Sequence, residues 1–168
     1  MTKHKEQRVG VFVDVQNMYH SAKNLYGANA NFKEILEAAT ADRKLIRALA
    51  YVIKSDSAEE ETFFDALFKQ GFEVHMKDLQ IFAGGSKKGD WDIGMAVDSI
   101  KMANKLDVVV LVTGDGDFIP LVQYLQHNKG CLAEVIAFGE TTSQRLMEAA
   151  DDFIDLSLDK KRFLLKKY

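Results

Sequence analysis

Cysteine and proline are almost absent from this chain, with one of each among 168 residues. The lone Cys131 excludes an internal disulfide and has no partners at zinc-site spacing, which is typical of a protein in a reducing compartment. We therefore expect a cytoplasmic location. Proline-rich or serine-rich linkers, internal repeats and low-complexity tracts are missing too, and this favours one folded domain.

Long apolar runs and a strong net charge are also missing. No segment approaches the roughly 18 apolar residues of a membrane helix. Residues 1–8 lack the apolar core of a signal peptide, so we expect no membrane association. The net charge of −3 excludes a protein that coats nucleic acid by bulk positive charge. It does not exclude a nuclease, because an acidic metal pocket offsets the basic residues around it.

The chain does contain a regular alternation of strand-like and helix-like segments. Buried strands are predicted at residues 10–13, 47–53, 72–76, 107–112 and 131–138, with a short sixth run at 153–156. Helices are predicted at residues 17–26, 32–45, 58–70, 91–104 and 118–128, with a short one from Ser143. This α/β order predicts a parallel sheet with helices on both faces.

Two of the predicted strands end in carboxylates. Asp14 follows the first strand, and Thr113-Gly114-Asp115-Gly116-Asp117 follows the fourth. If these two strands are neighbours, Asp14 and Asp115 lie at strand ends only about 5 Å apart, where open α/β sheets bind ligands. Grouped carboxylates repel one another unless a proton or cation is present, and oxygen ligands suit Mg²⁺ or Mn²⁺. The glycines are predicted to allow a tight turn and close approach of a phosphate.

The predicted helix at 91–104 carries two more acids, Asp92 and Asp98. Six residues on an α-helix separate them by about 120°, so both cannot readily face one cation. An apolar stripe is predicted to face the core, formed by Ile93, Ala96, Val97 and Ile100. Asp92 flanks this stripe near the helix start, where it is either a ligand or simply a helix cap or dipole partner. Asp98 lies nearly opposite, and its role stays open between support of the site and a solvated or structural position.

Four ordered blocks of the sequence resemble the NYN domain family, in its LabA-like branch of the PIN-like ribonuclease superfamily. They are Phe12-Val-Asp-Val-Gln-Asn17, Lys88-Gly-Asp-Trp-Asp-Ile-Gly-Met-Ala-Val-Asp98, Val112-Thr-Gly-Asp-Gly-Asp-Phe118 and Val135-Ile-Ala-Phe-Gly139 with the stretch up to Ile154. The resemblance implies a three-layer α/β/α PIN-like fold with a mainly parallel sheet of five or six strands. It also implies domain limits of 9–156, between a polar extension at 1–8 and a basic tail at 157–168.

The same resemblance implies a Mg²⁺ or Mn²⁺ site that hydrolyses RNA. Its catalytic and metal-binding acids match Asp14, Asp92, Asp115 and Asp117, and Asn17 matches the polar position beside the first acid. Simpler structural alternatives stay open for several of these side chains. Asp14 and Asp117 could cap helices and Asn17 could be an ordinary surface residue. The hydroxyl of Thr113 either supports the site or ends its strand without a further role.

Basic side chains are candidates for contacts with RNA phosphates, or else are solvated surface charges: Lys87, Lys88, Lys101 and Arg145. The glycine-rich loop at 83–89 is the best candidate for a clamp on the substrate. Trp91 beside it either stacks on a base or is buried under the loop. The tail at 157–168 could hold RNA, pack on a neighbour or be solvated.

The sequence therefore predicts a Mg²⁺- or Mn²⁺-dependent ribonuclease in which water attacks the phosphodiester directly. A non-catalytic RNA-binding or regulatory module that retains the acidic pocket is the main alternative. A small-substrate phosphohydrolase is a third reading, and the missing Asp-x-Asp at Asp14-Val15-Gln16 speaks against its aspartyl-phosphate form. A homodimer is compatible with the composition.

Overall fold

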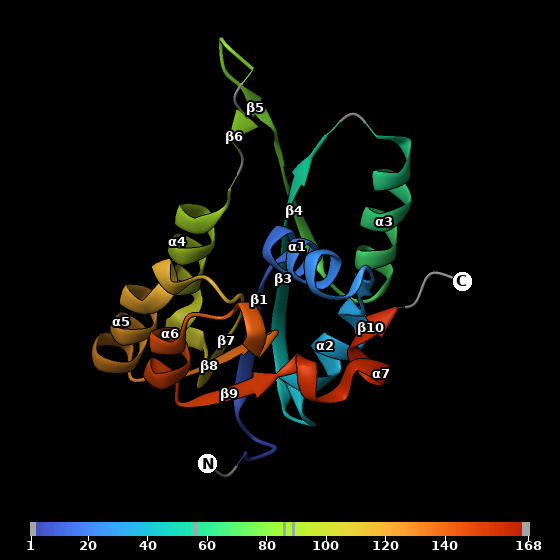
Figure 1. Cartoon of the computed structure of the whole chain (residues 1–168). Coiled ribbons are helices and arrows are strands. Elements are labelled where there is room, and N and C mark those ends of the chain that lie inside the picture. The colour runs from blue at the N-terminus through green and yellow to red at the C-terminus, as the bar shows by residue number, and fades with distance from the viewer. Residues whose placement is uncertain (1–2, 56, 86, 89, 166–168) are drawn as a thin grey trace.

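A six-stranded, fully parallel sheet forms the centre of the protein in the computed structural model, which describes residues 3–55, 57–85, 87–88 and 90–165 (Figure 1). The strand order is β4-β3-β1-β7-β8-β9, and each neighbouring pair is parallel. Their bounds are β1 Arg8–Asp14, β3 Lys44–Lys54, β4 Glu73–Asp78, β7 Val108–Val112, β8 Leu132–Ala137 and β9 Asp152–Asp155. The predicted parallel sheet is confirmed, as is the adjacency of the first and fourth strands, β1 and β7.

After β1 the chain adds β3 and β4 on one side of it and then β7, β8 and β9 on the other, and this places helices on both faces (Figure 1). One face is covered by α1 Val15–Tyr26, α2 Phe32–Thr40 and α3 Ala58–Lys69. The other is covered by α4 Asp92–Met102, α5 Ile119–Lys129 and α6 Gln144–Ala149. Crossovers of one handedness require this arrangement when strand order reverses. The reversal, or switch point, lies between β1 and β7.

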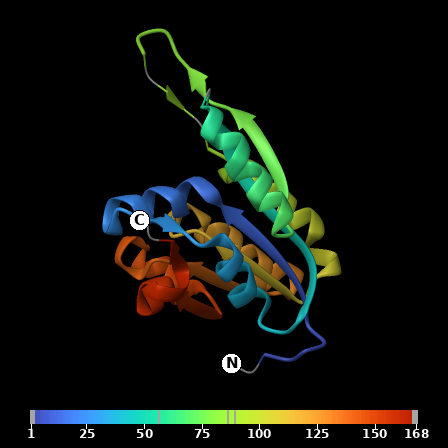
Figure 2. The ribbon, with the colours of Figure 1, turned by 90° about the vertical axis from the view of Figure 1, so that its right-hand side faces the viewer.

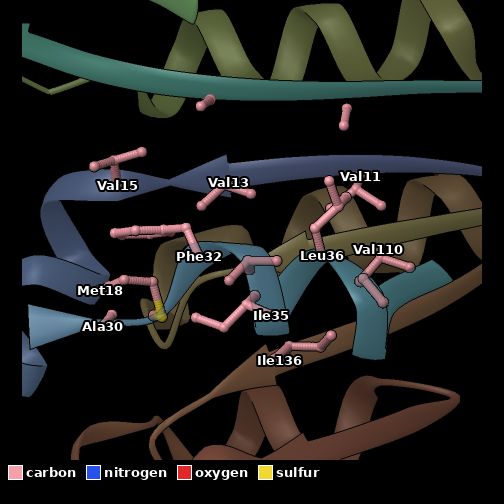
Figure 3. Packing of buried hydrophobic residues seen from close by; sticks show 14 of the residues in the cluster. Val11, Val13, Val15, Met18, Ala30, Phe32, Ile35, Leu36, Val110 and Ile136 are labelled. Carbon is pink, nitrogen blue, oxygen red and sulfur yellow. The ribbon is translucent and has the colours of Figure 1, made fainter. Parts of the chain in front are cut away.

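Alternate residues of the central strands supply the two cores, one for each helical layer. In β1, Val11 and Val13 face the α1–α3 layer, whereas Phe12 faces the α4–α6 layer. β7 repeats the pattern, with Val110 in the first core and Leu111 in the second. The first core interlocks β1 and β7 with α1 and α2 (Figure 3). A strand buried on both faces carries apolar residues at every position, which is why both strands read as continuous runs.

Shorter elements complete the domain and were not predicted. β2 Asn29–Ala30 pairs antiparallel with β10 Leu164–Leu165 near the C-terminal end, beside α7 Lys160–Phe163. β5 Gln80–Ile81 and β6 Lys87–Lys88 form a hairpin that follows β4 and extends away from the body of the domain (Figure 2). The described part of the chain also contains the 3₁₀ segments η1 Ala103–Lys105, η2 Gly116–Phe118, η3 Gly139–Thr141 and η4 Leu156–Asp159. Phe163, in the predicted basic tail, is buried in the first core.

The predicted helix at residues 32–45 is too long at its C-terminal end. α2 stops at Thr40 because Ala41 and Asp42 take left-handed backbone conformations, with φ of 49° and 59°. The chain then reverses and β3 begins at Lys44. The turn places Arg43 inward rather than on a helix surface.

Arg43 forms a buried ion pair with Glu134 of β8. Its two terminal nitrogens donate to the two carboxylate oxygens of Glu134 at 2.8 and 2.9 Å, and the side chains are only 1% and 3% exposed. The guanidinium also donates to the carbonyls of Ala39 and Thr40. These bonds join the end of α2 to the sheet.

Among the residues that the structure describes, no helix combines the length and apolarity that crossing a bilayer requires.

Candidate metal centre

Acidic side chains gather at the carboxyl edge of the sheet, beyond the switch point between β1 and β7. β1 ends in Asp14, and its neighbour Val13 pairs with Val112, the last residue of β7. The segment after β7 carries Asp115 and Asp117, and the first residue of α4 is Asp92. Three separate parts of the chain thus bring four carboxylates to one edge, which is where parallel sheets bind ligands.

Three of these acids form a cluster with the spacing of a metal site. Asp92, Asp115 and Asp117 each offer a carboxylate oxygen, and these oxygens lie within 4.8 Å of one another. Asp92 and Asp115 are half-buried, and Asp117 is exposed. Carboxylate oxygens are the ligands that Mg²⁺ and Mn²⁺ prefer, so the donor set of this acid cluster fits either ion.

Asp14 lies beside the acid cluster and also caps α1. Its Oδ1 accepts the backbone N–H of Asn17 at 3.1 Å, and its Oδ2 accepts the hydroxyl of Thr113 at 3.3 Å. Burial raises the pKa of Asp14, and the negative charge of Asp115 raises it further, while the two hydrogen bonds oppose the rise. Each oxygen has a second lone pair, so capping and cation binding are compatible at this side chain.

Thr113 and Asn17 connect the two strand ends. The Thr113 hydroxyl bonds Asp14 and accepts the N–H of Asp115 at 3.3 Å, and the side chain is fully buried. Asn17 Oδ1 accepts the N–H of Gly114 at 3.0 Å. The side chains of Thr113 and Asn17 therefore tie the start of α1 to the loop after β7.

Gly114 and Gly116 lie where a side chain would crowd the segment just before α6. A Cβ on Gly114 would lie 2.9 Å from Thr142 Oγ1 and 3.2 Å from the Thr142 Cα, and a Cβ on Gly116 would lie 3.0 Å from Ser143 Oγ. Neither glycine has a positive φ. The glycines let the segment before α6 pack against the acidic loop, which explains them without the phosphate contact that was predicted. Thr142 and Ser143 were missed as neighbours of the site, because only this packing reveals them.

Asp117 does not cap α5, although that role was one of its alternatives. The residue before α5 is Phe118, and no side chain caps the helix there. The capping carboxylate belongs to Asp115, whose Oδ1 accepts the N–H of Asp117 at 2.9 Å at the start of η2. The Asp117 side chain lies at the exposed side of the acid cluster, where the η2 turn positions it.

The predicted inward face of α4 is wrong for Ile93 and Val97, whereas Ala96 and Ile100 of the same stripe do pack against the second core. Ile93 is 80% exposed and Val97 is 45% exposed, while Met95 and Ser99 are fully buried. Ser99 can occupy the inner face because its hydroxyl donates to the carbonyl of Met95 at 2.7 Å, which satisfies it within the helix. The rotation turns much of the apolar stripe outward and leaves Asp92 facing the acid cluster.

Asp98 is directed away from the acid cluster, toward β3. Its Oδ2 accepts the hydroxyl of Tyr51 at 2.8 Å. Burial and the neighbouring Asp98 carboxylate both raise the pKa of Tyr51, so the phenol stays protonated and donates. Tyr51 pairs in register with Asp14. The Tyr51–Asp98 bond therefore fixes the rotation of α4 from the strand next to β1.

Trp91 has a structural position just before α4. Its indole N–H donates to the carbonyl of Val52 at 2.8 Å, and its ring packs against Tyr51 with centroids 5.4 Å apart. A Cβ on Gly94 would lie 2.6 Å from this ring. Asp90 Oδ1 accepts the N–H of Asp92 at 3.3 Å. These contacts fix the first turn of α4, and with it Asp92.

The predicted RNA-contacting residues lie on three separate elements, α6, α4 and β6. Arg145 is exposed in the first turn of α6, which begins beside the acidic loop because the N–H of Ser143 donates to the carbonyl of Gly114. Lys101 lies in the last turn of α4, about 13 Å along the helix from Asp92 at 1.5 Å per residue. Lys87 and Lys88 form β6, and their side chains lie outside the described part of the structure, as do Ser86 and Gly89 of the predicted clamp.

Among the described residues, burial and repulsion between the carboxylates dominate the electrostatics of the acid cluster. The pKa of Asp92 is raised to about 6, first by burial and then by the negative charges of Asp115 and Asp14. A bound cation would remove this conflict, because it favours the ionised form of each carboxylate. Hydrogen bonds to the carboxylates of Asp14 and Asp115 hold these two acids in place despite the mutual repulsion.

We expect the metal-free protein to become more stable as the pH falls from about 7 to about 5. The Asp92 pKa is about 6 in the folded state and 3.8 ordinarily, so over this range the folded state takes up a proton that the unfolded state does not. Asp92→Asn should be more stable than the parent at pH 7 in chelator and should lose this part of the pH dependence. Urea unfolding at both pH values measures it, with Asp98→Asn as the control. Equal pH dependence in the parent and Asp92→Asn would contradict the prediction.

Comparison with known proteins identifies the family. The model of the NYN domain matches residues 8–158, so the chain belongs to the NYN domain family, with a PIN-like α/β fold. The protein is 27% identical over 170 residues to the low amplitude and bright protein LabA of Synechococcus elongatus, covering 96% of this chain and 90% of that one. A crystal structure of a protein of unknown function from Vibrio parahaemolyticus superposes with a TM-score of 0.87 at 34% identity, covering 98% of this chain and all of the other. The predicted family resemblance is thereby confirmed.

Proposed function

We propose that this protein is a Mg²⁺- or Mn²⁺-dependent ribonuclease. The observation that carries the proposal is the convergence of carboxylate oxygens from Asp92, Asp115 and Asp117 within 4.8 Å, at the switch point of an NYN domain. NYN domains belong to a nuclease superfamily, and a cluster of this composition is suited to a divalent cation.

Asp92 and Asp115 are the half-buried acids that would hold the cation, with Asp14 beside them. A cation bound there would stabilise charge on the scissile phosphate and lower the pKa of the attacking water. Asp117 is the exposed member of the acid cluster, so its carboxylate can be reached by water from solvent, and we assign to it the acceptance of the proton. Thr113 and Asn17 keep the two strand ends together through the hydrogen bonds described above, which positions the acids before the substrate arrives.

The test is cleavage of labelled RNA, both single-stranded and structured, by the purified protein in Mn²⁺, beside the Asp14→Asn/Asp115→Asn variant. Cleavage by the parent and not by the variant supports the proposal. Equal cleavage by both would indicate a contaminating nuclease and would overturn it. Binding without cleavage would instead identify an RNA-binding or regulatory module, and release of phosphate from mononucleotides alone would identify a phosphohydrolase.

A further inference from the structure

An apolar groove of about 330 Å³ leads away from the acid cluster between α4 and α5. The two helices lie side by side (Figure 1), and both start at the carboxyl edge of the sheet. The acids Asp92 and Asp117, at the starts of the two helices, also line the groove. The walls beyond them are apolar or aromatic and come from Ile93, Ala96 and Ile100 of α4 and Pro120, Leu121 and Tyr124 of α5.

The groove wall contains apolar side chains that the fold does not use. Ile93 is 80% exposed and Tyr124 is 39% exposed, so neither is needed to fill the second core. Ile93 belongs to the outward-facing part of the α4 stripe, and Tyr124 lines the opposite wall from α5. Because the groove is continuous with the acid cluster, a ligand whose charged group lies at the cluster can place an apolar, flat part against these side chains.

We propose that the groove binds an unpaired nucleobase of the RNA next to the phosphate held at the acid cluster. This inference rests on the proposed ribonuclease function. A base reaches such a groove only when it is unpaired and unstacked, which is the state of bases in single strands and loops. Apart from Asp92, Asp117 and the Tyr124 hydroxyl, the side chains of the groove offer no hydrogen-bonding group. We therefore expect little preference among bases, as in other sites that bind through base faces.

The size and position of the groove favour a base over a protein partner. Its volume is at the lower end of small-ligand sites, which span about 300–1,000 Å³. A stable protein interface needs roughly 800 Å² from each partner, and a base needs only one short slot. A cation held by the acids at the end of the groove would also set the direction of the ligand, with its phosphate toward Asp92 and Asp117.

The test compares Ile93→Ser with Val97→Ser. Ile93 lines the groove, whereas Val97 lies on the same helix, is 45% exposed and does not line it. Protein is titrated against labelled single-stranded RNA in Mn²⁺ under single-turnover conditions, and the half-saturating protein concentration is recorded. Where the RNA stays intact, anisotropy gives the same quantity. We expect Ile93→Ser to raise the half-saturating protein concentration about tenfold, and Val97→Ser to leave it unchanged.

Two further arms identify the ligand. The Ile93→Ser effect should vanish on RNA with abasic sites, because no base then enters the groove, and on the same sequence as a duplex. Equal half-saturating concentrations for the parent and Ile93→Ser would overturn the groove while leaving the nuclease proposal intact. RNA that is bound but not cut, and bound more weakly by Ile93→Ser, would support the groove and reject the nuclease. A parent that binds no RNA, or a dimer in gel filtration that Ile93→Ser dissociates, would overturn the groove.

Discussion

Asp115→Asn is expected to lower the rate of RNA cleavage by on the order of 10²- to 10³-fold. It should also abolish the rise in unfolding temperature that millimolar Mn²⁺ gives the parent. Asp115 contributes an oxygen to the acid cluster and, through Oδ1, caps the η2 turn by accepting the Asp117 N–H. Asparagine keeps an oxygen for the cap and loses the negative charge. The loss should therefore concern the cation and leave the fold intact.

Asp98→Asn is the matched control for this variant. It removes the same charge from an acid near the site, but Asp98 bonds Tyr51 and does not belong to the acid cluster. We expect it to retain both cleavage and the response to Mn²⁺. If Asp115→Asn responds to Mn²⁺ as the parent does, the cation is held elsewhere and the assignment of the acid cluster is wrong.

Glu134→Ala is expected to cost about 3–5 kcal/mol of the free energy of unfolding, because it leaves the buried Arg43 guanidinium without its counter-charge. The substitution removes both hydrogen bonds between Arg43 and Glu134 at once. The carbonyls of Ala39 and Thr40 still accept from Arg43 but cannot neutralise its charge. Urea unfolding monitored by circular dichroism measures the change.

Glu73→Ala provides a comparison for the same chemistry at the surface. Arg47 also donates two hydrogen bonds to Glu73, both 2.7 Å long, but the two side chains are 41% and 46% exposed. We expect a cost below about 1 kcal/mol. The double change Arg43→Leu/Glu134→Leu should recover much of the stability lost in Glu134→Ala, since it removes the unpaired charge altogether. Equal costs for the buried and exposed pairs would contradict this account.

The parallel sheet and its acidic edge were predictable because the signals are local. Buried strands such as β7 read as uninterrupted apolar runs, and the acids that follow β1 and β7 stand directly after those runs in the sequence. Their meeting required only that β1 and β7 be neighbours. The family resemblance supplied Asp92, which no strand end indicated.

The rotation of α4 could not be predicted because it depends on partners far along the chain. The apolar stripe of Ile93 and Val97 competes with Met95 and Ser99 for the inner face, and composition alone favours the stripe. The Tyr51–Asp98 bond and the Trp91 contact with Val52 decide the outcome. Similarly, the end of α2 depends on the pairing of Arg43 with Glu134, 91 residues away.

The bond between Thr113 and Asp14 joins residues 99 positions apart, so Asp14 comes to lie beside the acid cluster only after β1 and β7 have paired. Contacts of such separation form late, since the loop that they close must first be ordered. The unfolded chain has no preformed site, and a cation that binds the acids will select the completed fold. Cation occupancy would then report on the pairing of β1 with β7, and the cation supply in the cell would help to set how much of the protein is folded.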